Sequence, residues 1–286
     1  MRYETPQSLE AAAGLLAAET GLAKVLSGGT DLLVQMKSGM VEPDLVVDLK
    51  SIAAVREVKE EAGGFRIGAC VPTAALREHK HFRAAWPAII EGAKLIGSTQ
   101  VQGRATLTGN LCNASPAADS VPGMVAAGAK ARITGPKGQR EIPVEQVPER
   151  SGRTTLAKGE FIDSIFVPAS APHSGSAYFR FTPRTEMDIA VVSAAVAITL
   201  DAKGICTHAR VALGAVAAKV VLAEEAAKAI IGTPVDKAAL DKLQAAASAA
   251  ATPIDDKRGT KEFRVEVAGV LARRAAEKAL ARAKGM

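Results

Sequence analysis

The sequence predicts an α+β fold in two successive domains, and three observations lead to this prediction. Residues 1–52 alternate apolar strand patterns with helical patterns, which is typical of a small βαβ subdomain. Residues 53–174 carry hairpins about glycine turns and short helical patterns, which indicates a larger mixed subdomain. Residues 175–286 hold three strand patterns and then alanine-rich helices, which predicts a small sheet followed by helices. The segment "PASAPHSG" at 168–175 has the composition of a linker, so we place the domain boundary at residue 174.

The elements expected in the first part of the chain have local signals. Ser8 can cap a first helix, and Pro87 suits the first turn of a later one. Residues 97–119 are polar and glycine-rich without a clear period, which predicts a functional loop. The sequence predicts, in order, a helix over 9–18, a strand over 23–26, a helix over 30–37, a strand over 44–49, a hairpin over 57–69, a helix over 73–79 capped by Thr73, and a helix over 86–96.

The remaining elements follow from the same reasoning. The last helix has apolar residues at near-helical spacing with Arg and Lys between them, so we expect it to pack on the small sheet. A docking surface for a partner is the alternative role. The sequence predicts a hairpin over 129–142, strands over 176–182, 190–200 and 209–214, and helices over 222–231, 237–250 and 263–284.

Composition excludes several function classes. The net charge is +6, but Lys and Arg are dispersed and aromatic residues make up only 3% of the chain, so we expect no nucleic-acid partner. The charge instead favours an anionic cofactor or an acidic protein partner. No apolar run reaches about 18 residues, so we expect neither a membrane span nor secretion, and the cytoplasm is the expected compartment. Cys70, Cys112 and Cys206 stand far apart without a CxxC pair, so we expect no metal site in this chain.

A first glycine loop, residues 26–32 ("LSGGTDL"), joins a predicted strand to a predicted helix. Such a junction gathers free backbone N–H groups at a helix start, which favours a phosphate. The loop lacks the Gly-Lys-Ser/Thr of a P-loop and the third glycine of the dinucleotide fingerprint. Asp48 alone fits the fingerprint's ribose-binding acid. By itself the loop is compatible with a phosphate site or with a ligand-free tight turn.

A second loop, residues 106–119, strengthens the case for a ligand. Thr106, Thr108, Gly109 and Asn110 bring hydroxyls, a glycine and an amide together, and Asp119 follows beyond a Ser-Pro turn. Two polar glycine loops in one mixed domain suit a long ligand that contains a diphosphate. One loop would hold the pyrophosphate, and the other would hold the ribityl or ribose hydroxyls.

Three segments together resemble a known family. They are "LSGGTDLLVQMKSG", "TLTGNLCNASPAADSVP" and "FRFTPRTEMDIAVVSAAVAI", and the resemblance extends over essentially the whole chain. The family is that of the FAD-binding medium subunits of molybdenum hydroxylases, the group of carbon monoxide dehydrogenase and xanthine dehydrogenase. The resemblance implies a PCMH-type (vanillyl-alcohol-oxidase-like) FAD-binding domain of two subdomains. It also implies that a C-terminal domain like that of the CO dehydrogenase flavoprotein follows, a small antiparallel sheet with a helical bundle.

The resemblance also implies a set of cofactor contacts. Relatives usually carry a glycine where Thr108 stands, and some carry a tyrosine where Ile189 stands. The contacts that the resemblance implies are Leu26, Ser27, Gly28, Gly29, Thr30, Asp31 and Leu32 around the pyrophosphate; Thr106, Thr108, Gly109 and Asn110 at the diphosphate and ribityl chain; Asp119 on a cofactor hydroxyl; Ile162 at the adenine or ring edge; Arg180 near the isoalloxazine carbonyls; and Asp188 and Ile189 against the ring face.

Structural roles are the alternatives for several of these residues. Asp119 can instead cap the helix that follows it, and Arg180 can instead pair with Glu186 or Asp188 at the surface. Asp31 can complement a helix dipole. None of the four histidines lies in either loop, so we expect a non-covalent FAD.

The implied function is electron transfer. A subunit of this family takes electrons from a small iron–sulfur subunit, which a large molybdopterin subunit supplies, and passes them from FAD to an external acceptor. We therefore expect no catalytic residue and no metal ligand here, with the [2Fe-2S] clusters and molybdopterin confined to partners. The expected assembly is a heterotrimer or a dimer of heterotrimers. The alternatives are a stand-alone FAD-dependent oxidoreductase and a non-catalytic binding protein, and neither the reducing substrate nor the acceptor is specified by this sequence.

Overall fold

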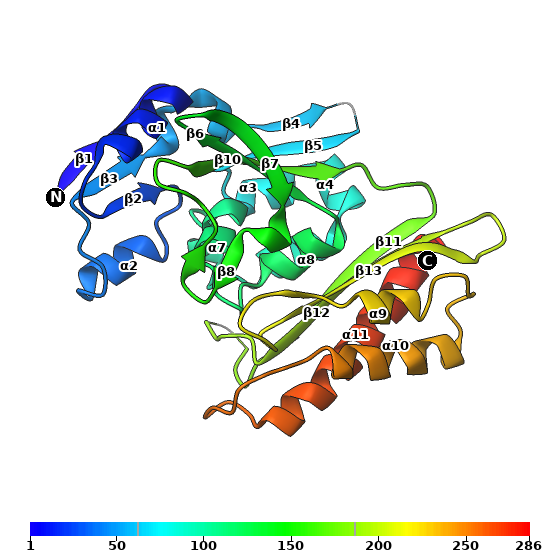
Figure 1. Ribbon diagram of the computed structural model, residues 1–286. Coiled ribbons are helices and arrows are strands. Elements are labelled where there is room, and N and C mark those ends of the chain that lie inside the picture. Colours follow the sequence, from blue (N-terminus) through cyan, green and yellow to red (C-terminus); the bar gives the residue numbers. More distant parts are fainter. Residues whose placement is uncertain (62, 186) are drawn as a thin grey trace.

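The computed structural model describes residues 1–61, 63–185 and 187–286. Figure 1 shows a small N-terminal subdomain beside a larger mixed subdomain, with the C-terminal sheet and its helices at the other end of the molecule. The mixed helix and strand composition agrees with the predicted α+β class.

The N-terminal subdomain is a three-stranded parallel sheet with two helices. β1 (Arg2–Glu4) and β2 (Ala23–Leu26) both pair in parallel with the central β3 (Leu45–Asp48), so β2 is an edge strand. α1 (Leu9–Ala18) precedes β2, and the βαβ unit is confirmed. α2 (Leu32–Lys37) begins two residues later than predicted: Gly29 has φ +81°, which a helix does not accommodate, and the side chain of the N-cap residue Asp31 makes no capping bond.

The larger subdomain is built on an antiparallel sheet in the order β4-β5-β10-β6-β7. The pairing of β10 with β6 shifts register between Ile162 and Ser164, which marks a bulge. Its elements, with the short 3-10 turns η1 to η3, are η1 (Leu49–Ser51), η2 (Ala53–Arg56), β4 (Val58–Glu61), β5 (Gly64–Gly68), α3 (Thr73–Glu78), α4 (Lys80–Ala85), α5 (Pro87–Ala93), α6 (Thr99–Gln102), α7 (Leu107–Cys112), α8 (Ser120–Ala126), β6 (Lys130–Gly135), β7 (Gly138–Pro143), η3 (Val144–Gln146), β8 (Pro148–Arg150), β9 (Arg153–Thr154) and β10 (Phe161–Pro168).

Two predictions in this subdomain were wrong in detail. Thr73 does not cap α3: the N-cap is Pro72, and the Thr73 hydroxyl donates instead to the Gln102 carbonyl at 3.2 Å. The segment over 97–119 is not a continuous loop, since it contains α6 and α7. Both helices are too short to show a period in the sequence.

The C-terminal domain is a four-stranded antiparallel sheet covered by helices. The order is β11-β12-β13-β14, and α10 and α11 lie across one face (Figure 1). The three predicted strands and three predicted helices are present, and the short β14 was not predicted. The elements are β11 (Ser174–Phe181), β12 (Val192–Leu200), β13 (Cys206–Gly214), β14 (Val221–Leu222), α9 (Glu224–Lys228), α10 (Lys237–Ala249) and α11 (Lys261–Ala283).

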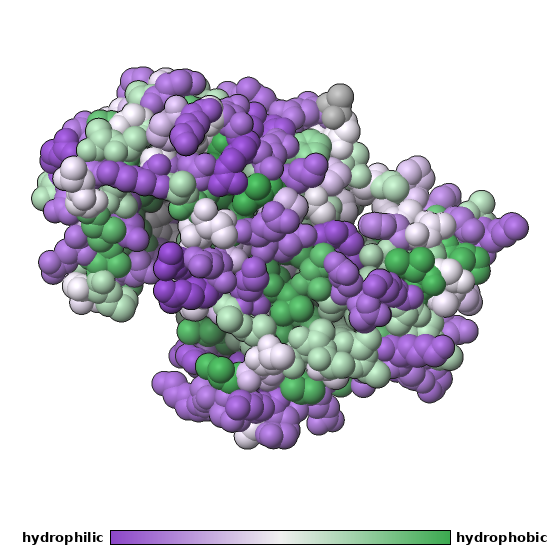
Figure 2. All heavy atoms as spheres, viewed as in Figure 1, coloured by the Kyte–Doolittle hydropathy of each residue, from purple (hydrophilic) through white to green (hydrophobic). Residues whose placement is uncertain are grey.

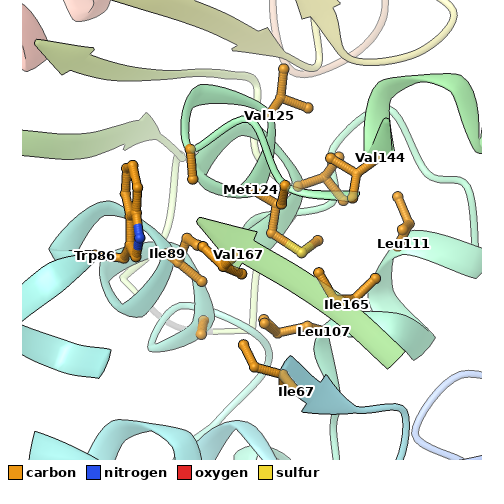
Figure 3. Close-up of a cluster of buried hydrophobic side chains, with 14 of the residues drawn as sticks. Ile67, Trp86, Ile89, Leu107, Leu111, Met124, Val125, Val144, Ile165 and Val167 are labelled. Carbon is orange, nitrogen blue, oxygen red and sulfur yellow. The ribbon is translucent and has the colours of Figure 1, made fainter. Parts of the chain in front are cut away.

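The main hydrophobic core holds the second loop in place. Figure 3 shows Ile165 and Val167 of β10 facing Leu107 of α7 and Met124 of α8. Leu107 and Leu111 are 1% and 0% exposed, so α7 is anchored by its apolar residues. Burial of each such side chain contributes about 1.5–3 kcal/mol. The polar residues of α7 are therefore presented from a rigid base.

On the face shown in Figure 2, hydrophilic side chains predominate, and apolar side chains gather over α2 and over the C-terminal domain. Leu33 and Val34 of α2 are 50% and 62% exposed. The part of the chain that the structure describes contains no helix of the length and hydropathy needed to span a bilayer.

Candidate cofactor-binding site

A cavity of about 490 Å³ lies between the two loops and β10. This volume is within the usual range for small-molecule and cofactor sites, roughly 300–1,000 Å³. The structure brings together most of the residues implied by the resemblance. Those that line the cavity are Leu26, Ser27, Gly28, Gly29, Thr30, Asp31, Leu32, Thr106, Thr108, Gly109, Asn110 and Ile162.

The first loop presents free backbone donors to this cavity. Within the described parts of the chain, the N–H groups of Gly28, Gly29 and Thr30 donate to no protein acceptor. Gly29 has φ +81°, a conformation that favours glycine. A Cβ on Gly28 would lie 2.1 Å from the Arg104 carbonyl oxygen, so the glycine allows the chain just before the second loop to pack against the first. Successive free N–H groups form an anion-binding surface.

The second loop is held by its own side chains. Thr106 Oγ1 accepts from the Gly109 N–H at 2.9 Å, which caps α7, and lies 3.2 Å from Ser27 Oγ of the first loop. Asn110 Oδ1 accepts from the Ser120 hydroxyl at 2.7 Å and from the Ser120 N–H at 3.2 Å. These bonds fix Thr106 and Asn110 at the cavity wall.

Asn113 of the second loop bonds Asp31 of the first loop and Gln35 of α2, and we call this contact the clasp. Asn113 Nδ2 donates to Asp31 Oδ1 and Gln35 Nε2 donates to Asn113 Oδ1, each at 3.3 Å. Gln35 and Asn113 both line the cavity. The sequence analysis missed them, because one lies within a predicted helix and the other beyond the threonine and glycine positions that drew notice.

Asp48 does not reach the cavity, so its interpretation as a ribose-binding acid does not hold. Its carboxylate is 5% exposed and bonded to the Tyr3 hydroxyl and to Lys50, whose Nζ lies 2.7 Å from Oδ1. The spacing from the glycine loop matched the dinucleotide fingerprint, but the side chain turns inward to these partners.

Asp119 and Arg180 form a buried ion pair outside the cavity lining. Arg180 Nη1 lies 2.6 Å from Asp119 Oδ2 and also donates to the Leu95 carbonyl at 3.0 Å. The Tyr178 hydroxyl donates to Asp119 Oδ1 at 2.7 Å. Burial raises the pKa of Asp119 to about 6, against the opposing effects of Arg180 and Tyr178.

This ion pair decides between the alternative roles. The Asp119 side chain makes no capping bond to α8, so the capping alternative is wrong. Arg180 pairs with Asp119 and not with Asp188; Glu186 lies outside the described residues. The pair sits next to the cavity wall, since Leu95 precedes the lining residue Ile96.

Asp188 and Ile189 also lie outside the cavity lining. Asp188 Oδ2 accepts from the Arg184 N–H at 3.0 Å, and Oδ1 accepts from the Ile189 N–H at 2.9 Å. Ile189 is 52% exposed. The Asp188 carboxylate is thus bonded to its neighbours along the chain, and neither residue lines the cavity.

The lining fits a dinucleotide cofactor. Free N–H groups and hydroxyls suit a diphosphate, while Ile96, Phe161 and Ile162 provide apolar wall for flat rings. The edge of β2 borders the same space through Lys24, Val25 and Leu26. The donors and the apolar walls are both supplied by this chain alone.

Two protein-family models match this chain and together span most of its length. Residues 1–170 match the FAD binding domain in molybdopterin dehydrogenase, and residues 177–279 match the CO dehydrogenase flavoprotein C-terminal domain. The chain belongs to this flavoprotein family. Similar proteins are the carbon monoxide dehydrogenase medium chain of Afipia carboxidovorans, 36% identical over 99% of this chain and 97% of the relative, and the xanthine dehydrogenase FAD-binding subunit of Escherichia coli, 29% identical over 99% and 97%.

Solved structures agree with this assignment. The flavoprotein matches a chain of the Cu,Mo-CO dehydrogenase in its cyanide-inactivated form with a TM-score of 0.93 and 35% identity, covering 99% of this chain and 98% of the other. A chain of quinoline 2-oxidoreductase from Pseudomonas putida matches with a TM-score of 0.90 and 25% identity, covering 99% and 98%.

These matches confirm the predicted fold class, family and cofactor. The protein is an FAD-carrying oxidoreductase subunit of the molybdenum hydroxylase type. Within the described residues, no group of three or more His, Cys, Asp or Glu side chains is placed to hold a metal ion. The redox centre that the family assigns to this chain is the flavin.

Proposed function

We propose that the flavoprotein holds FAD with its diphosphate on the first loop and passes electrons from an iron–sulfur subunit to an external acceptor. The observation that carries the proposal is the run of free N–H groups at Gly28, Gly29 and Thr30 beside the cavity. Bound FAD supplies reversible two-electron and one-electron redox chemistry. The residues of this chain bind and orient it.

Each group of lining residues has a proposed role. Thr106, Thr108, Gly109 and Asn110 would meet the diphosphate and ribityl chain from the second loop, and Ile162 would border the adenine or the ring edge. Asn110 suits this role because its Oδ1 is bonded inside the protein, while its Nδ2 donates to no acceptor among the described residues.

The four residues outside the lining keep their proposed roles on weaker structural support. Asp119 would bind a cofactor hydroxyl, Arg180 would lie near the isoalloxazine carbonyls, and Asp188 with Ile189 would face the ring. What supports the first two is their position behind Ile96 and beside the Ser120 contact of Asn110. To reach the cofactor, Arg180 would have to share its guanidinium between Asp119 and the ligand.

The partners are proposed from the relatives. Relatives are called medium chains of carbon monoxide dehydrogenase, which implies a small and a large chain beside them. We propose the same arrangement here: a small subunit with [2Fe-2S] clusters and a large subunit with molybdopterin, in a heterotrimer or its dimer. We place the complex in the cytoplasm. We also retain residue 174 as the boundary between the two domains.

The reducing substrate is proposed to be selected outside this chain. Full-length relatives of this flavoprotein carry the names of carbon monoxide, xanthine and 6-hydroxypseudooxynicotine dehydrogenases. One subunit type thus accompanies chemically unrelated substrates. A stand-alone oxidase is not favoured, since a substrate base beside the flavin is needed and the described cavity lining contains no His or Tyr.

Two measurements test the proposal. The purified chain is mixed with FAD, freed of excess and treated with acid; flavin bands that pass into the supernatant are expected, and a colourless chain would contradict the site. The complex purified from the native cells through a tag on this chain should then contain molybdenum and iron. Bleaching of the flavin by an organic substrate in the isolated chain would instead establish the stand-alone oxidase.

A further inference from the structure

Lys50, which the sequence analysis did not single out, lies beneath the first loop. Its Nζ donates to the Ser27 carbonyl at 3.2 Å and to Asp48 Oδ1 at 2.7 Å. Its backbone N–H also donates to Asp48 Oδ1, at 3.0 Å, and the Tyr3 hydroxyl bonds the other carboxylate oxygen. A cation is thereby fixed at the base of the loop.

The ion pair persists at neutral pH. Burial by itself would raise the pKa of Asp48, but the hydrogen bonds from Lys50 and Tyr3 outweigh it, and the pKa lies below its usual value. Asp48 stays ionised and keeps the Lys50 ammonium in place. The Lys50 side chain is only 33% exposed, so these contacts hold it in one position.

The contact with Ser27 sets the direction of the first free donor. The peptide bond between Ser27 and Gly28 is planar and trans, so its C=O and N–H point in opposite directions. With Lys50 holding the carbonyl on one side, the Gly28 N–H is directed to the other side.

The charge of Lys50 also compensates for the lining itself. Among the described lining residues the only cation is Lys24, whereas Asp31 and Glu160 are acids. Glu160 is bonded to Arg140, at 2.8 Å, but Asp31 meets only an amide through the clasp. An anionic diphosphate therefore needs positive charge from behind the loop.

We propose that Lys50, with Asp48 as its counterion, is a positioning residue for the cofactor diphosphate. It orients the Ser27–Gly28 peptide and places a positive charge behind the first loop. This inference rests on the proposed binding of the diphosphate by that loop. The inference does not depend on where the flavin ring lies.

The test compares FAD binding by the flavin-free full chain and its variants. The double variant D48N/K50M removes the cation without leaving a buried charge unpaired. K50R keeps a cation, and K59M removes a 57%-exposed lysine of β4 as a matched control. Dissociation constants are measured for FAD, ADP and riboflavin at several salt concentrations, and thermal melting confirms that each variant is folded.

The expected results distinguish a specific effect on diphosphate binding from a general loss of structure. D48N/K50M should weaken FAD and ADP by the same factor, about tenfold to a hundredfold, and leave riboflavin unchanged. The salt dependence of its FAD affinity should match that of the wild type, because the double variant removes one charge of each sign. K50R should stay within about threefold of the wild type, and K59M should not differ from it.

Other outcomes overturn the inference. Equal losses for FAD and riboflavin would show a general structural role, and unchanged FAD and ADP binding would show no role. If K50M, made alone as a second variant, retains wild-type affinity while folded, the inference fails as well. A wild-type chain that does not bind FAD would instead overturn the proposed function, independently of Lys50.

Discussion

The two loops around the cavity differ in the groups that they offer. The first loop leaves the N–H groups of Gly28, Gly29 and Thr30 without an acceptor among the described residues, and its shape depends on close packing at Gly28. The second loop uses Thr106 and Asn110 to complete bonds within the protein. The first loop therefore offers backbone N–H groups to the cofactor, and their direction depends on the conformation of the loop. The second loop offers side chains that local hydrogen bonds hold in place.

The largest effect is expected from Gly28→Ala. The added Cβ would lie 2.1 Å from the Arg104 carbonyl oxygen and 2.9 Å from its carbon, so the first loop and the chain that leads into the second loop would have to separate. Overpacking of this kind costs about 1–3 kcal/mol of stability. FAD affinity should fall at least about a hundredfold, as measured by flavin fluorescence titration, because the free donors move with the loop.

Gly14→Ala is the matched control, since a Cβ there meets nothing within 4 Å and lies in α1. It should leave FAD affinity unchanged and raise the free energy of unfolding by about 0.5–1 kcal/mol. Wild-type FAD binding by Gly28→Ala would show that the contact between the loops is dispensable.

A second prediction concerns Asp119, at the far end of the second loop. Its pKa in the folded protein is about 6, above the usual value of 3.8, chiefly because of burial. Between these values the folded state binds a proton that the unfolded state has released. Stability should therefore fall as pH rises from about 4 to 6, by up to about 3 kcal/mol from this group, and then level off.

Asp119→Asn isolates this contribution. Asn does not titrate, and its single amide oxygen can accept from only one of Tyr178 and Arg180, so the variant loses one bond by an amount that does not depend on pH. The difference in unfolding free energy between wild type and variant, measured with urea at pH 4, 5, 6 and 7, should change across this window. A constant difference would mean that Asp119 titrates outside it, with Arg180 dominating over burial.

A third, smaller effect is expected from Thr106→Val. The change removes the hydroxyl that caps α7 and contacts Ser27, at nearly constant shape. Loss of such a cap costs about 1 kcal/mol, and FAD should bind about fivefold to tenfold more weakly. Thr106→Ser keeps the hydroxyl and should behave as wild type in both titration and thermal melting. Equal FAD affinities and equal melting temperatures of the Val and Ser variants would show that the Thr106 hydroxyl contributes neither to binding nor to stability.

The sequence predicted the framework of the fold and both loops, because strand and helix periods and glycine positions are local properties. It assigned Gly28 to close approach of an anion, whereas the structure shows a contact with Arg104, 76 positions along the chain, which only the fold reveals. The same holds for the pairing of Asp119 with Arg180 and for Lys50 beneath Ser27. Each of these contacts joins residues that lie far apart in the sequence, so no local pattern predicts it.

The smallest effect is expected from the clasp. Asn113→Ala removes both clasp bonds, one from Gln35 and one to Asp31, and each is 3.3 Å long and partly open to water. Such bonds contribute about 0.5–1 kcal/mol, so FAD should bind about twofold to fivefold more weakly. The loss should lie in faster dissociation, measured by stopped-flow displacement, because the clasp links the two loops that line the cavity.

Gln35→Ala removes one of the two clasp bonds and should have part of the same effect. Because Gln35 and Asn113 bond each other, the double variant should dissociate no faster than Asn113→Ala alone. Additive effects would contradict a shared clasp and would assign separate contacts with the cofactor to the two side chains. The comparison between the loops then becomes sharper: backbone donors of the first loop determine affinity, and side chains that link it to the second determine how long the cofactor stays.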